Sequence, residues 1–304
     1  PSIRKDNILK RRTPERLIAG LIAASILAKC GCELRGVPGF FRIDGVWCFN
    51  LEPGMLIPTR NAVGQIVALQ VRRDKPSDWN DYCKRTGQNK EFLRYMTISA
   101  KGLPDGVTTD ISQAHFPLGN DSLDDPETAV CITEDPLKAD AAVELKGNRK
   151  MFFIALHGTS NTKTLPAIFA WLKGKGVETV FNVFDMDKVT NVNVAKAGKR
   201  VRAIAAGYGI KLAEKCWDAE YAQQKLSELN AICCEHGIFV PTTFNVFTDL
   251  ANVSQELAKR NIRHSRVKNA DGLEEKHYWS DKTKGIDDYL LSIRTATGGE
   301  GASA

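Results

Sequence analysis

The feature that most constrains this fold is a regular alternation of short apolar segments and helical segments between residues 129 and 213. The apolar runs that predict strands cover 130–133, 151–156, 177–184 and 210–213. The segments that predict helices cover 136–145, 164–172 and 192–206. Strands that alternate with helices in this way pack as a parallel sheet with helices on both faces. We therefore expect an α/β fold for this part of the chain.

The residues before this alternation follow a different pattern. An apolar run at 17–28 begins after Thr13-Pro14-Glu15, which is typical of a helix start. The run is shorter than the ~20 residues that cross a bilayer, so it predicts a buried helix and no membrane partner. Short alternating segments at 40–49, 55–58 and 65–71 predict a hairpin and two further strands. Turn-rich residues at 119–128 mark a boundary, so we expect a smaller basic α+β module at 1–120 and an α/β domain from 121.

The charge is mildly basic and unevenly distributed. The 304 residues carry 42 Lys and Arg against 36 Asp and Glu, a formal net charge of +6, and 43% hydrophobic residues exclude wholesale disorder. Bases concentrate at 4–12 and at 72–94, where Trp79, Tyr82 and Phe92 are interleaved with them. Such a segment suits single-stranded nucleic acid. The alternative is an exposed loop that its aromatic side chains anchor to the core.

The eight cysteines are scattered and show no paired Cys-x-x-Cys spacing. This pattern predicts buried free thiols in a reducing, cytoplasmic setting, and no zinc site. The tetrapeptide Phe-Asn-Val-Phe occurs at 181–184 and again at 244–247. We interpret the repeat as coincidence rather than as a decayed duplication. The small polar residues of the tail, 296–304, predict disorder.

Acidic residues follow the ends of predicted strands. Glu134 comes directly after the first strand, and Asp185-x-Asp187 comes after the third. A third cluster, Asp287-Asp288, lies in a turn that leads into a helix. In an open parallel sheet ligands bind outside the carboxyl ends of the strands, and converging carboxylates need a cation. The simplest interpretation is a Mg²⁺ site for phosphoryl transfer. The alternative is that these acids cap the helices that follow them.

A Glu after the first strand and an Asp-x-Asp after the third resemble the toprim domain, which primases share with topoisomerases and some nucleases. Further motifs resemble the catalytic core of DnaG-type primases. They are Met55 to Arg60, Gly64 to Arg72, Phe92-Leu93-Arg94-Tyr95, His157-Gly158-Thr159 and Lys284 to Leu290. The sequence around Glu134 and Lys284 is most similar to primase-like toprim proteins of plasmids, phages and integrative elements. The resemblance covers roughly residues 37–292.

The resemblance implies roles for individual residues. Catalysis would use Glu134, Asp185 and Asp187, and the metal ligands would be these three with Asp287 and Asp288. Nucleotide or DNA contacts would come from Arg60, Arg72, Arg73, Arg94, Lys138 and Lys284. Where the family has Gly after the Glu, this chain has Asp135, which tolerates a left-handed turn but adds a charge that alters metal binding. The stretch before Lys284 exceeds the family core, which implies an insertion around 214–280 in a catalytic domain that spans 121–295.

The implied function is a primase-like nucleotidyltransferase that makes short primers for DNA replication on single-stranded DNA, from NTPs, with Mg²⁺ or Mn²⁺. A replicative helicase of a mobile genetic element is the expected protein partner. One alternative is a toprim nuclease that acts through the same carboxylates. A second alternative is a non-catalytic accessory protein that holds DNA or nucleotide for that helicase.

Overall fold

The computed structural model describes residues 14–50, 53–74, 94–109, 112–268 and 274–296. The chain divides into two compact units, 1–113 and 114–304, and each is described by itself. The basic segment 75–93, the N-terminal arm and the tail from 297 lie outside the described residues. Among the residues that the structure describes, no helix combines the length and the apolar character that a membrane crossing requires.

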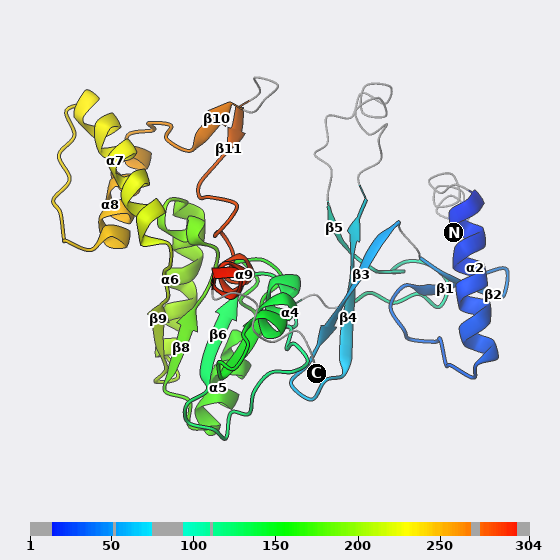
Figure 1. Cartoon of the computed structure of the whole chain (residues 1–304). Coiled ribbons are helices and arrows are strands. Elements are labelled where there is room, and N and C mark those ends of the chain that lie inside the picture. The colour runs from blue at the N-terminus through cyan, green and yellow to red at the C-terminus, as the bar shows by residue number, and fades with distance from the viewer. Residues whose placement is uncertain (1–13, 51–52, 75–93, 110–111, 269–273, 297–304) are drawn as a thin grey trace. The chain divides into compact units, whose positions relative to one another are not determined.

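The first unit combines one-sided helix packing with small antiparallel sheets (Figure 1). Its elements are α2 (Pro14–Lys29), β1 (Phe40–Ile43), β2 (Val46–Phe49), β3 (Gly54–Arg60), β4 (Ile66–Arg73) and β5 (Tyr95–Thr97). The predicted hairpin is confirmed as β1 paired with β2, and the next two predicted strands are confirmed as β3 and β4. β5 adds to β4, which gives the sheet order β3-β4-β5.

The prediction that the first helix is buried is wrong for one of its faces. Ile18, Ile22 and Ile26 are each more than half exposed. The opposite face carries Gly20 and Ala24 and packs on β2 so closely that a Cβ on Gly20 would lie 2.3 Å from the Phe49 carbonyl oxygen. A helix on a sheet this small buries one stripe only, because no second layer covers it within the described residues of this unit.

The second unit is built on a four-stranded parallel sheet in the order β7-β6-β8-β9. Its first elements are β6 (Ala129–Thr133), α4 (Pro136–Leu145), β7 (Met151–Ala155), α5 (Leu165–Gly174), β8 (Thr179–Asn182), the 3-10 turn η1 (Met186–Val189), α6 (Val192–Ala206) and β9 (Lys211–Glu214). They are followed by α7 (Ala219–Glu235), α8 (Val246–Lys259), β10 (Arg266–Lys268), β11 (Glu274–Lys276) and α9 (Ile286–Ala296). The predicted α/β fold, a parallel sheet flanked by helices, is confirmed.

Two hydrophobic cores lie on opposite faces of this sheet. Side chains alternate along a strand, so Val130 and Ile132 pack into one core and Cys131 into the other. Helices α5 and α6 cover the first face, and α4 and α9 cover the second. The helices that follow the neighbouring strands β6 and β8 therefore lie on opposite faces. The carboxyl ends of β6 and β8 therefore lie at the switch point of the sheet, the place where ligands of parallel sheets bind.

Candidate functional site

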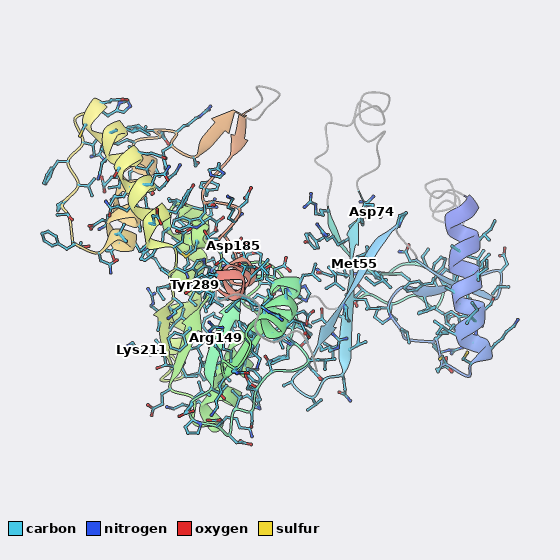
Figure 2. The ribbon with its side chains drawn as sticks, in the orientation of Figure 1. Met55, Asp74, Arg149, Asp185, Lys211 and Tyr289 are labelled. Carbon is cyan, nitrogen blue, oxygen red and sulfur yellow. The ribbon has the colours of Figure 1, made fainter. Side chains whose placement is uncertain are left out.

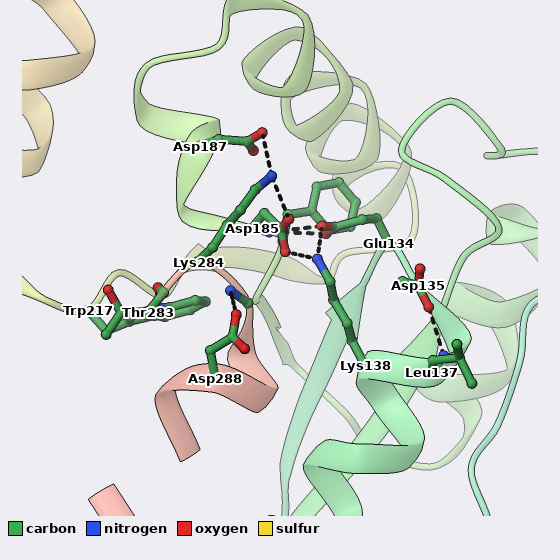
Figure 3. Close-up of polar contacts among 12 residues, drawn as sticks. Glu134, Asp135, Leu137, Lys138, Asp185, Asp187, Trp217, Thr283, Lys284 and Asp288 are labelled. Atoms are coloured by element: carbon green, nitrogen blue, oxygen red, sulfur yellow. Dashed lines mark hydrogen bonds and ion pairs between the residues drawn. The ribbon is translucent and has the colours of Figure 1, made fainter. Parts of the chain in front are cut away.

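The carboxyl ends of β6 and β8 bring together carboxylates that are 51 residues apart in the sequence (Figure 3). Glu134 follows β6, and its two carboxylate oxygens accept the backbone N–H of Asp185 at 3.2 and 3.1 Å. Asp185 follows β8 and Asp187 lies in η1, and both residues are buried. Figure 2 shows Asp185 at the carboxyl edge of the sheet, opposite the edge where Lys211 begins β9.

Two lysines supply positive charge to this cluster. The Lys138 ammonium is one helical turn past Glu134, lies 3.2 Å from the Glu134 carboxylate and also donates to Asp185. The Lys284 ammonium lies 3.7 Å from Asp185 and 3.9 Å from Asp187. Within the described residues, no three His, Cys, Asp or Glu side chains are arranged to hold a metal ion in this state. The ammonium groups of the two lysines stand beside the carboxylates instead.

Backbone contacts fix the segments that carry these side chains. The Gly158 N–H donates to the Glu134 carbonyl at 2.8 Å, and Gly158 has a φ of +88°, which glycine adopts without strain. The Met186 N–H donates to the Lys284 carbonyl at 2.8 Å, which joins η1 to the loop before α9. Trp217 Nε1 donates to the Thr283 carbonyl at 2.6 Å in the same loop. Lys284 and the carboxylates are therefore carried by separate loops, and these hydrogen bonds hold the loops in place.

Asp135 stands where the primase motif has Gly, and this position predicts a left-handed backbone. Asp135 does not adopt that conformation. Its φ and ψ are −135° and 126°, an extended conformation, and its carboxylate accepts the Leu137 N–H at 2.8 Å. Asp135 is therefore the N-cap of α4, and Pro136 occupies the first helical position. Figure 3 shows its side chain directed to Leu137, not to Asp185.

The two acids at the start of α9 have different environments. The Asp288 carboxylate accepts the Gly285 N–H at 2.8 Å and so caps α9. The Asp287 Oδ1 atom is buried, has no hydrogen-bond partner in the described part of the chain, and lies where a Cβ on Gly285 would meet it at 2.2 Å. Asp187 Oδ1 is likewise buried without a partner there. These two oxygens can accept an external cation or donor.

The crowding of carboxylates changes how they titrate. Burial, followed by the charge of Asp185, raises the pKa of Glu134 to about 8. Burial also raises the pKa of Asp187 to about 6 and, together with Asp288, raises the pKa of Asp287. Burial alone would raise the pKa of Asp185, but the hydrogen bond from Glu134 and the charge of Lys138 lower it. The two shifts have opposite signs, so Glu134 holds a proton in preference to Asp185.

The structure brings together Glu134, Lys138, Asp185, Asp187, Lys284, Asp287 and Asp288 in the second unit. The predicted arginines belong to the first unit. Arg72, Arg73 and Arg94 lie at one end of the β3-β4-β5 sheet, where the Arg73 N–H donates to the Arg94 carbonyl. Arg60 lies at the opposite end of β3, beside the turn that leads to β4.

Sequence reasoning missed two groups of bases near the site. Lys188 is buried in η1 and donates to the carbonyls of Asn182 and Lys215 at 2.8 and 2.6 Å. Nothing in its local sequence indicates this role, because its partners follow two different strands. The second group is on α6, which carries four bases and no acid. That signal was readable in the sequence.

Comparison with known proteins gives little beyond this geometry. No protein-family model matches the chain, and no curated protein matches it. One solved structure with similarity is the crystal structure of the Aquifex aeolicus primase, zinc-binding and RNA polymerase domains, at 12% identity and a TM-score of 0.38. The alignment covers 74% of this chain and 43% of that one. We therefore argue function from the residues of the site.

Proposed function

We propose that the chain is a primase-like nucleotidyltransferase that uses Mg²⁺, or Mn²⁺ in its place, to synthesise short primers on single-stranded DNA. The observation that carries the proposal is the convergence of Glu134, Asp185 and Asp187 at the carboxyl ends of β6 and β8. Carboxylates that meet at such a point are typical of cation-assisted phosphoryl transfer. The resemblance of the surrounding motifs to primase cores adds the choice of nucleotides and DNA as substrates.

The donor chemistry of the cluster suits a hard divalent cation, although the described side chains are not arranged around one. All of its donor atoms are carboxylate oxygens, the ligand type that Mg²⁺ prefers. Two of the oxygens, Asp187 Oδ1 and Asp287 Oδ1, are buried without a partner in the described part of the chain. A buried polar atom without a partner is costly in free energy, and a bound cation would remove that cost.

Each residue then has a role. Asp185 and Asp187 would hold the cation, and Glu134 would be a further ligand or a general acid/base, for which a pKa of about 8 is suitable. We assign the second metal position to Asp287, because Asp288 caps α9. Bound Mg²⁺ stabilises negative charge on phosphate oxygens. Lys138 and Lys284, with Arg60, Arg72, Arg73 and Arg94 of the first unit, would contact nucleotide or template phosphates.

The test is primer synthesis from labelled NTPs on single-stranded DNA, with Mg²⁺ or Mn²⁺. We expect template-dependent oligonucleotides from the wild-type chain and a loss of about a hundredfold or more in Asp185→Asn. The matched control is Glu144→Gln, an exposed acid on α4. It removes one charge without touching the cluster and should keep the wild-type rate. Degradation of the DNA, or no product at all, would overturn the proposal.

One observation favours the non-catalytic alternative. The Lys138 ammonium contacts both Glu134 and Asp185, where a cation would otherwise supply the positive charge. A chain that keeps this lysine in place would bind nucleotide or DNA through its phosphates without chemistry. Binding of NTPs that is unchanged by EDTA, together with no product in either metal, would support this function instead.

A further inference from the structure

Helix α6 presents a concentration of positive charge outside the acidic cluster. Val192–Ala206 carries Lys196, Lys199, Arg200 and Arg202 and no acidic residue. All four side chains are exposed. Arg202 pairs with Glu214 at 2.5 Å, whereas the other three form no ion pair within the residues that the structure describes. The helix therefore has net positive charge that the described residues leave without a carboxylate partner.

A furrow runs along the seam between α6 and α8. It consists of three adjoining hollows of about 420, 350 and 450 Å³, each within the size range of ligand sites. The first and second hollows share Ala195 and Lys199, and the second and third share Val192 and Ala258. Because neighbouring hollows share lining residues, they follow one another along the two helices, and we call this row of hollows the α6–α8 furrow.

The lining of the furrow suits a phosphodiester chain. Lys196, Lys199 and Arg263 line it with positive charge, and the acid among its lining residues, Glu214, is already paired with Arg202. Amide side chains alternate with these bases along its length, as in Asn193 and Gln255. Lys, Arg, Asn and Gln are the residues that contact phosphate and sugar in nucleic-acid complexes.

One end of the furrow adjoins the segment that carries Asp187. The N–H groups of Thr190 and Asn191 donate to the Asp187 carbonyl at 3.0 and 2.6 Å, and both residues line the last hollow. His264 also lines this hollow. A ligand in this end of the furrow would therefore lie beside the segment that carries Asp187.

The other end of the furrow adjoins an exposed aromatic ring. Phe244 is 94% exposed and directly precedes Asn245, which lines the first hollow. Its φ of +61° is rare for an aromatic residue. The neighbouring loop is fixed by the buried Asp249, which accepts the Thr242 hydroxyl at 2.7 Å and the Thr243 N–H at 2.6 Å. An exposed aromatic ring on a hydrogen-bonded loop can serve as a stacking platform for a base.

We propose that the α6–α8 furrow binds single-stranded nucleic acid, with Lys196 and Lys199 on its phosphates and Phe244 stacked on a base. Stacking on Phe244 favours a single strand, because an unpaired base offers the π-face that stacks on an exposed aromatic ring. The binding needs neither the carboxylates nor a metal ion. It is therefore independent of the proposed chemistry.

The test measures binding of fluorescein-labelled oligo-dT to the full chain by anisotropy, in EDTA and over a range of salt concentrations. A double variant, Lys196→Gln with Lys199→Gln, should make the negative slope d log K/d log[salt] less steep by about 1.4. Each phosphate contact on a single strand contributes about 0.7 to the steepness of this slope. Lys211→Gln removes an exposed base at the opposite edge of the sheet and should leave the slope unchanged. An unchanged slope in the double variant would overturn the proposal.

Further variants test the base platform and the class of ligand. Phe244→Ala should weaken oligo-dT binding about fivefold or more, and Phe244→Tyr, which keeps a ring, should restore it. Equal affinity for a duplex of the same length would overturn the single-strand assignment. Competition by polyglutamate as strong as by oligo-dT would indicate an acidic protein partner and would also overturn it. All substituted side chains are exposed, and a thermal melt checks that each variant folds.

Discussion

The carboxyl edge of the parallel sheet and the α6–α8 furrow hold charge in opposite ways, although both belong to the second unit. The edge buries carboxylates from segments far apart in the sequence, and Lys138 and Lys284 neutralise them at short range. The furrow exposes bases from one helix, and Lys196 and Lys199 have no carboxylate partner in the described part of the chain. Buried charge couples to folding, whereas exposed charge is available to a ligand.

The largest effect on stability should come from Lys138→Met. It leaves Glu134 and Asp185 without the ammonium that contacts both, and breaking a buried pair costs about 3 kcal/mol or more. Urea unfolding in EDTA measures the loss, and added Mg²⁺ should recover part of it if a cation replaces the ammonium. The control is Lys150→Met, whose surface pairs with Asp125 and Glu127 should contribute far less to stability than the contacts of Lys138. Equal losses of unfolding free energy in Lys138→Met and Lys150→Met would contradict the distinction between the carboxyl edge of the sheet and the protein surface.

The next effect is a pH dependence from Glu134. Its pKa is raised from 4.5 to about 8 in the fold, so the folded chain binds more protons than the unfolded chain between these values. The free energy of unfolding in EDTA should therefore fall as pH rises from 5 to 9, by at least about 1.4 kcal/mol, the equivalent of one pKa unit. Asp185, Asp187, Lys138 and Lys284 face the same cluster, and the raised pKa of Asp187 adds to the fall up to pH 6.

Glu134→Gln should flatten this pH dependence, because the amide stays neutral throughout. Glu144→Gln replaces an exposed acid on α4, and its plot of unfolding free energy against pH should stay parallel to that of the wild type. Parallel curves for Glu134→Gln as well would show that the proton resides elsewhere in the cluster.

A smaller effect separates Asp135 from the metal-binding acids. Asp135→Ala removes the N-cap of α4 and should lower the free energy of unfolding by about 1 kcal/mol, whereas Asp135→Asn should retain most of it. The stabilisation by added Mg²⁺, measured as a shift in the urea midpoint, should be the same in both variants. A reduced Mg²⁺ effect in Asp135→Asn would place Asp135 among the ligands.

The smallest effect on stability should come from the furrow. Replacing Lys196 and Lys199 by Gln should change the free energy of unfolding by less than about 0.5 kcal/mol, because both side chains are exposed. Urea unfolding of the same double variant that is used for DNA binding measures this. A loss comparable to that in Lys138→Met would mean that these bases are structural, and the contrast between the two regions would disappear.

The local sequence pattern was sufficient to predict most of the helices and strands around the site. The ends of α4 and α6 fall at the predicted residues, because Pro136 and Gly207 are local signals of a start and an end. The β8 strand is shorter than its apolar run, since Phe184 leaves the ladder and packs in the core before η1. Lys138 illustrates the limit: its spacing from Glu134 is local, but its contact with Asp185 depends on β6 and β8 being neighbours.

The tetrapeptide Phe-Asn-Val-Phe shows the same limit. At 181–184 its first two residues end β8 and its last two follow the strand into the core, whereas at 244–247 it forms a left-handed turn and the start of α8. The two copies have identical side chains, and their surroundings alone decide which structure each adopts. The sequence by itself determined the order of strands and helices, the start and end of α4 and α6, and the acids at strand ends, because these depend on neighbours along the chain. Only the tertiary structure decided which carboxylates meet, which lysines join them and which helix face stays exposed, because strand order and layer packing bring distant residues together.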